Sequence, residues 1–263
     1  MTLADDTRAI VARLRDWGYS IREEAGCYGR SNGTSWSAGR PEGHVAHHYV
    51  CSLNSSQSYI DGLVANLKAG ATVQWFADVN GRGYLIGDGP ANHAGTGNSS
   101  VLAGVRADKA PPGPASSAGD MSGNQALAGT ECQHPGDSTP WPTPMVDLLV
   151  AIAAASALQY GWTANRVIQH YEWTARKIDC SAAGGPASGA AAGTELRRRV
   201  AQRMGGDQEM NDEDRKWITD QLAALPDKVW RRKVTGPGTG DAGLPADEVI
   251  RRTGRSTGAL PDE

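Results

Sequence analysis

The sequence predicts an α/β fold, because helical and strand-like patterns alternate along residues 1–205. Apolar residues at helical spacing indicate helices over residues 3–18 and 57–69, and a nearly all-apolar segment indicates another over 145–160. Short apolar segments lie between these helices. Hydrophobic residues make up 39% of the 263 positions, which is enough to bury a substantial core.

The first half of the chain gives the clearest elements. Helix 3–18 places Ile10, Val11 and Leu14 on one face, and the Gly-rich segment 26–43 after it is expected to be a loop. Helix 57–69 carries apolar residues at i, i+3, i+4 and i+7. The expected strands are 44–50, then 72–77 and 83–86 as a β-hairpin around the turn Asp78-Val79-Asn80-Gly81, and later 164–170.

The second half divides at Gly205-Gly206. Helix 145–160 is expected to be buried across a sheet. Its apolar stretch, residues 145–158, contains Asp147 and is expected to be too short to span a bilayer. A short polar helix over 195–204 ends at the two glycines. We therefore expect one domain over residues 1–205, followed at 206–263 by a helix from Asn211 to Leu225 and a flexible tail of unknown role.

Composition excludes several classes of function. Lys and Arg number 26 against 29 Asp and Glu, a net charge of −3, whereas a nucleic-acid-binding protein needs a basic excess. The four cysteines lie far apart without a CxxC, which fits neither a disulfide scaffold nor an all-thiolate zinc site. The N-terminus carries charges where a signal peptide needs an apolar core. We expect a protein made in the cytoplasm, with no nucleic-acid partner and no stable membrane insertion.

The six histidines are the candidate chemical groups. His47 and His48 lie in the expected strand 44–50, where successive side chains point to opposite faces, so they are not expected to bind one ion together. His170, Lys177 and Asp179 fall within ten residues after a later strand. Imidazole and carboxylate groups suit zinc, and three protein ligands plus a water form the usual catalytic arrangement.

Four further aromatic residues have expected roles or positions. His93 is expected either to line a substrate groove or to bond a backbone carbonyl. Trp75 and Trp173 are expected to pack in the core, whereas Trp141, between two prolines, is expected to be the most exposed tryptophan.

The order of five segments carries a family resemblance. They are VAHHYV, WFADVNGRGYLIGDG, NHAGTGN, AGTECQ and QHYEWTARKID, within about residues 40–205. Together they resemble the type-2 N-acetylmuramoyl-L-alanine amidases, the zinc-dependent family of phage lysins and peptidoglycan recognition proteins. The compact arrangement is most similar to a phage endolysin. The resemblance implies a central mixed β-sheet flanked by helices, with zinc at the floor of a groove.

Residue by residue, the resemblance implies a zinc site and two catalytic groups. Zinc would be bound by His47, His170 and Asp179, with His48 as the second choice for the first ligand. Cys180 stands where the family usually has proline, and some relatives use a cysteine as third ligand, so Asp179 and Cys180 both stay open. The resemblance also makes Glu131 the general base and Lys177 the cation beside the developing oxyanion.

The implied function is hydrolysis of the amide bond between N-acetylmuramic acid and L-alanine in bacterial peptidoglycan. Two alternatives are a non-catalytic peptidoglycan-binding module and a zinc peptidase that cuts peptidoglycan cross-links. As a phage lysin without a signal peptide, the protein would be made in the host cytoplasm. It would reach the cell wall after release, with a pore-forming partner providing the route.

Overall fold

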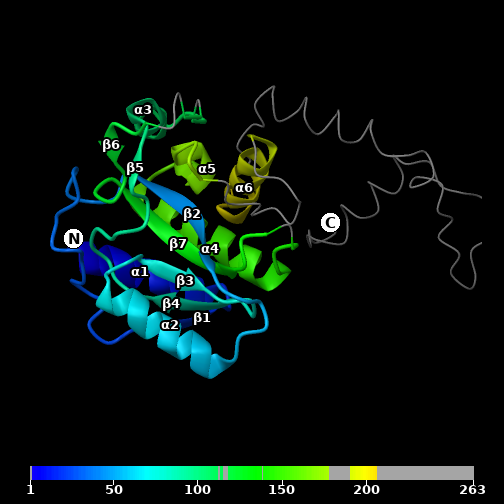
Figure 1. Cartoon of the computed structure of the whole chain (residues 1–263). Coiled ribbons are helices and arrows are strands. Elements are labelled where there is room, and N and C mark those ends of the chain that lie inside the picture. The colour runs from blue at the N-terminus through cyan, green and yellow to red at the C-terminus, as the bar shows by residue number, and fades with distance from the viewer. Residues whose placement is uncertain (1, 112, 115–117, 138, 178–189, 206–263) are drawn as a thin grey trace, which may run out of the picture. The chain divides into compact units, whose positions relative to one another are not determined.

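A computed structural model describes residues 2–111, 113–114, 118–137, 139–177 and 190–205. A mixed six-stranded β-sheet lies at the centre with helices on both faces, which confirms the expected fold class (Figure 1). The helix expected over 211–225 and the tail lie outside the described residues. The strands, in their order across the sheet, are β1 (Ser20–Glu23), β4 (Arg82–Leu85), β3 (Trp75–Ala77), β7 (Leu127–His134), β2 (Gly43–Val50) and β8 (Val167–Gln169).

The hairpin β3–β4 is the antiparallel part of this sheet, and the other strand pairs are parallel. Its turn is held by Asp78, whose carboxylate accepts hydrogen bonds from the backbone N–H groups of Asn80 and Arg82 at 2.9 and 3.0 Å. Gly81 has φ +74°, a left-handed conformation that favours glycine. The expected hairpin is confirmed.

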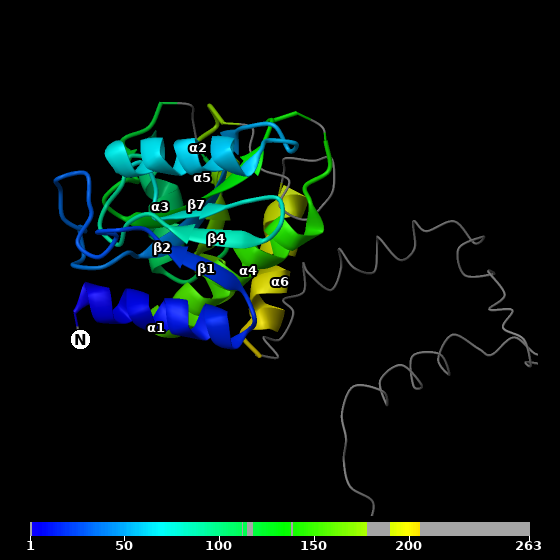
Figure 2. The same cartoon turned by 90° about the horizontal axis from the view of Figure 1, so that it is seen from below.

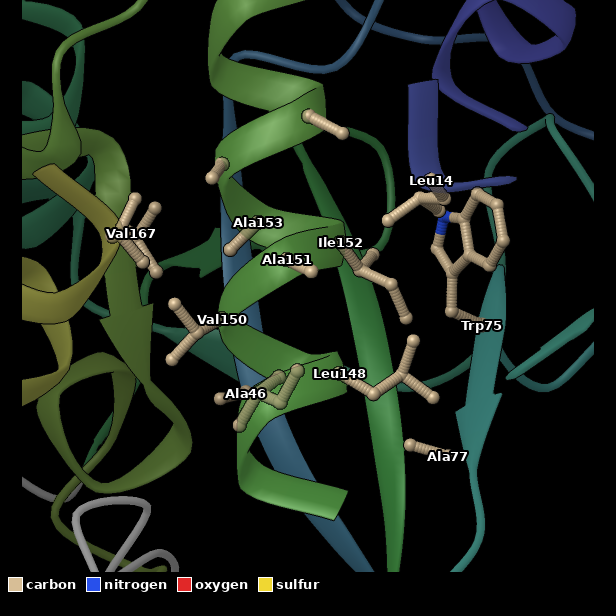
Figure 3. Packing of buried hydrophobic residues seen from close by; sticks show 14 of the residues in the cluster. Leu14, Ala46, Trp75, Ala77, Leu148, Val150, Ala151, Ile152, Ala153 and Val167 are labelled. Atoms are coloured by element: carbon tan, nitrogen blue, oxygen red, sulfur yellow. The ribbon is translucent and has the colours of Figure 1, made fainter. Parts of the chain in front are cut away.

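Three helices cover one face of the sheet: α1 (Leu3–Asp16), α4 (Thr143–Tyr160) and α6 (Ala190–Arg203). Figure 3 shows α4 against the sheet, with Leu148 and Ile152 directed towards Trp75. Helix α4 has 18 residues and is long and apolar enough to cross a membrane by length and composition, so the expectation that its apolar stretch is too short is wrong on that criterion. It is instead a buried core helix, because the sheet covers one side of it and α1 and α6 cover the remaining sides.

The opposite face is covered by α2 (Gln57–Ala69), α3 (Ser99–Arg106) and the single-turn helix α5 (His170–Trp173). Figure 2 shows α2 and α1 on opposite sides of the sheet. Helix α2 packs on Phe76, Tyr84 and Ile86, whereas α3 and α5 pack on Val45 and Ile168. A small antiparallel pair, β5 (Thr96–Gly97) and β6 (Met121–Ser122), lies beyond β4 in the chain.

The structure departs from the sequence prediction in several places, among them α6, which begins at Ala190 instead of residue 195, and the strands β5, β6 and β7, which were not among the strands expected from the apolar patterns. The segment 164–170 forms a 3₁₀ turn and then the short strand β8, and His170 begins α5. Strand β1 and helix α3 were not predicted, since β1 buries only Ile21 and α3 has eight residues. The prediction that Trp141 is exposed is wrong: it is 5% exposed and stacks on the ring of His134.

Candidate functional site

Two histidines predicted to bind metal lie side by side. His47 occupies the middle of β2 and His170 follows the parallel neighbouring strand β8, so both reach the same level of the sheet. Their ring centroids are 4.2 Å apart at an interplanar angle of 76°. The side chains are buried, at 1% and 5% exposed. Residues 123 positions apart in the chain are thereby brought into contact.

His93 completes a cluster of three imidazoles. It lies in the loop after β4, and its Nδ1 is 2.9 Å from Nε2 of His47. Its Nε2–H donates to the backbone carbonyl of Leu127 at 2.9 Å. Of the two alternatives for His93, the structure therefore contains the bond to a backbone carbonyl. Burial lowers the pKa of His93 to about 3, so the ring is neutral near pH 7.

Glu131 lies beside this cluster on β7. It is the register partner of His47 on one side and of Phe76 on the other. Paired residues of neighbouring strands project from the same face, so the carboxylate shares the face of His47. Glu131 is 8% exposed. A buried carboxylate next to a pair of imidazoles is a suitable proton acceptor.

The strand alternation separates His48 from the cluster. His48 projects from the opposite face of β2, where its ring lies 6.2 Å from the ring of His134. A Cβ on Gly136 would be 2.6 Å from Nε2 of His48, so His48 packs against that glycine. The structure thus places His47, rather than His48, beside His170.

Of the remaining predicted residues, Lys177 is the last residue of the described segment 139–177. Lys177 is exposed, and its backbone N–H donates to the carbonyl of Thr174 at 3.1 Å. Among the described residues, Lys177 forms no ion pair. Asp179 and Cys180, the two candidates for the third ligand, lie outside the described residues.

The donor groups fit a zinc ion. Two imidazoles lie in contact, and the chain leads from His170 to a carboxylate and a thiol at positions 179 and 180. Such nitrogen, oxygen and sulfur donors are those that zinc prefers. Within residues 2–177 and 190–205, apart from the short gaps given above, no set of three His, Cys, Asp or Glu side chains is arranged to hold a metal. A zinc site with three protein ligands would therefore need a ligand from outside the described residues.

A pocket of about 470 Å³ opens at the carboxyl ends of β2 and β7. It begins three residues beyond His47, a span of about 10 Å along a strand. Ligands of open α/β sheets commonly bind at this edge. Val50 and Tyr59 in its wall are 69% and 55% exposed, which leaves apolar surface for a ligand. Its lining residues are Val50, Cys51, Ser52, Leu53, Asn54, Tyr59, Pro135, Asp137 and Thr139.

A family model described as N-acetylmuramoyl-L-alanine amidase matches residues 37–182, more than half of the chain. The chain belongs to this amidase family. The matched range contains His47, His93, Glu131 and His170, the residues that the fold brings together. Membership supports peptidoglycan amidase activity.

Several solved amidase structures are similar to this family member at low identity. Hydrolase AmiA of Staphylococcus aureus, in complex with its ligand, is 16% identical, with 74% of this chain and 89% of that chain covered and a TM-score of 0.43. AmiD from E. coli, in complex with anhydro-N-acetylmuramic acid-L-Ala-D-gamma-Glu-L-Lys, is 14% identical, with 88% and 78% covered and a TM-score of 0.43. The endolysin of a Thermus scotoductus bacteriophage is 15% identical, with 71% and 99% covered and a TM-score of 0.39. No curated protein matches the sequence of this amidase.

The sequence named His47, His170 and Glu131, which the fold brings together, but it missed two contacts around them. The hydrogen bond between His93 and His47 joins residues that are 46 positions apart. No local sequence pattern predicts it. The second contact is a buried ion pair between Glu172, in the helix begun by His170, and Arg197 of α6. Arg197 lies between Leu196 and Val200 in the sequence, on a helix face that is otherwise apolar. That position was the sequence feature from which a buried ion pair could have been predicted.

Proposed function

We propose that this protein hydrolyses the amide bond between N-acetylmuramic acid and L-alanine in peptidoglycan, with zinc bound by His47, His170 and Asp179. The contact between His47 and His170, with Glu131 in register beside them, is the observation that supports the proposal most directly. Cys180 is the alternative to Asp179 as third ligand. The substrate class follows from family membership.

The chain's own residues have separate tasks in this reaction. Zinc held by these ligands would lower the pKa of a water to about 7 and polarise the scissile carbonyl. Glu131 takes the proton from the attacking water and delivers it to the leaving nitrogen of L-alanine. Lys177 supplies positive charge beside the developing oxyanion, an interaction worth about 3–4 kcal/mol in comparable sites. The side of the pocket formed by Val50 and Tyr59 provides an apolar surface for the peptidoglycan fragment.

Digestion of purified peptidoglycan, with and without a chelator, tests the proposal. Release of free stem peptides that begin with L-alanine, lost on chelation and restored by zinc, is the expected result by mass analysis. Protein that sediments with intact, uncut wall would instead indicate a binding module. Fragments cut within the cross-links would indicate a peptidase.

We also propose that the protein is a phage lysin, made in the host cytoplasm and active on the wall after release. The order and compactness of the sequence motifs support this role. Production in a bacterial host should cause no lysis alone, and rapid lysis once a pore-forming protein opens the inner membrane. Lysis that needs no pore, or an intact wall after the pore has opened, would contradict this role.

A further inference from the structure

We propose that His93 is a positioning residue, which fixes the tautomer of His47 so that the lone pair lies on Nδ1 and is available to zinc. The inference deepens the proposed function, since it concerns the same site. Ligand histidines generally donate their second ring N–H to an acceptor, and this outer contact orients the ring and raises its basicity. The structure contains such a contact in which the acceptor is another histidine.

The direction of the hydrogen bonds that join Leu127, His93 and His47 follows from the Leu127 carbonyl. The carbonyl of Leu127 can only accept, so Nε2 of His93, 2.9 Å away, carries the proton. In a neutral ring Nδ1 of His93 is then an acceptor. Nε2 of His47 lies 2.9 Å from this Nδ1 and must donate to it. The lone pair of the neutral His47 ring is therefore on Nδ1.

The residue after His93 acts in the same way on His170. The carbonyl of Ala94 lies 3.4 Å from Nε2 of His170, a longer contact that favours the same tautomer. Two adjacent residues of one loop thus face both candidate zinc histidines. The loop itself is anchored, because the backbone N–H of Gly95 donates to the side chain of Asn124 at 2.8 Å.

Gly129 makes room for the contact between His47 and His93. A Cβ at this position would lie 2.5 Å from Nδ1 of His93 and 3.2 Å from Nε2 of His47, the two atoms that share the hydrogen bond. Gly129 also donates its backbone N–H to Gln74 at 2.7 Å, which fixes its position. The absence of a side chain at this buried strand position is explained by the hydrogen bond above it.

Three variants separate the proposal from a loss of packing. His93→Phe keeps a ring but removes both polar atoms, His93→Gln retains one donor and one acceptor, and Gly129→Ala displaces His93 without changing it. His134→Phe is the matched control, because His134 is also buried and also bonds a backbone carbonyl, that of Thr139, but on the opposite face. Circular dichroism of each full-length variant establishes that it is folded.

The first measurement is the tautomer of His47 in the metal-free wild-type protein, by ¹⁵N NMR of the imidazoles, assigned with His47→Gln. We expect a protonated Nε2, and mixed tautomers in His93→Phe. A His47 ring protonated on Nδ1, or a doubly protonated His93, would overturn the proposal. This result does not depend on activity or on zinc, so it remains decisive if the proposed function fails or if a variant does not fold.

The second measurement is zinc affinity by competition with a chelator. Loss of an outer contact typically weakens metal binding about 10–100-fold. We expect a loss of that size in His93→Phe and Gly129→Ala, a smaller loss in His93→Gln, and wild-type affinity in His134→Phe. Unchanged affinity in folded His93→Phe would overturn the proposal, as would an equal loss in His134→Phe.

Discussion

Arg197 and Glu172 form a buried ion pair that connects α6 to the turn carrying His170. Nη1 of Arg197 lies 2.9 and 3.1 Å from the two carboxylate oxygens of Glu172. The side chains are 10% and 6% exposed. Glu172 also accepts the backbone N–H of Gln169 at 2.9 Å, and Arg197 donates to the carbonyl of Val167 at 3.3 Å. The pair thus joins α5 to α6, the described elements before and after positions 179 and 180 in the sequence.

Removing either Arg197 or Glu172 alone should lower the free energy of unfolding substantially. In Arg197→Met the apolar volume is largely kept, but the carboxylate of Glu172 stays buried without its cation. Breaking a buried pair in this way costs about 3–5 kcal/mol. For a domain of this size that corresponds to a fall in Tm of roughly 6–20 °C. The double variant Glu172→Gln/Arg197→Met should regain most of the loss, because no unpaired charge remains.

The neighbouring residue provides a matched control. Arg198 pairs with Glu195 within the same helix, at side-chain exposures of 29% and 19%. Arg198→Met should therefore cost less than about 1 kcal/mol. Urea denaturation followed by circular dichroism gives the free energy of unfolding of each variant. Equal losses in Arg197→Met and Arg198→Met, or no recovery in the double variant, would refute the reasoning.

Three further predictions concern the site and the core. His170→Ala should abolish zinc retention and wall digestion whereas His48→Ala should keep stoichiometric zinc, as measured by metal analysis; zinc retained in His170→Ala would contradict the ligand assignment. Glu131→Gln and Lys177→Ala should retain zinc and each lose at least about a hundredfold in the rate of peptide release, and a near-normal rate would remove that residue from the mechanism. Burial lowers the pKa of His44 to about 3, so the unfolded chain binds a proton below about pH 6.5 that the folded protein rejects. The free energy of unfolding should consequently fall as the pH drops from 6.5 towards 3, by at most about 1.4 kcal/mol per pH unit from this group, and folded His44→Gln should show a shallower slope; an unchanged slope would refute the assignment.

Local sequence patterns predicted the helices and strands whose apolar residues lie on one face. Helix α2 begins and ends where its apolar spacing indicates, at Gln57–Ala69, and the hairpin follows from Asp78 and Gly81. Strand β1 escaped prediction, because one buried side chain gives no periodicity. Trp141 was misjudged because its flanking prolines suggested a surface loop, whereas its ring stacks on that of His134.

The sequence by itself determined that His47 and His48 must face opposite sides of one strand, because alternation is a property of the extended backbone. Together with the motif order, it also predicted His47, Glu131 and His170, which the fold brings together. Only the tertiary structure decided which of the two histidines meets His170, since that depends on which face of the sheet α4 covers and which is left to α2 and α5. The parallel register that sets Glu131 beside His47 is likewise a long-range property of the fold, fixed by packing between distant segments.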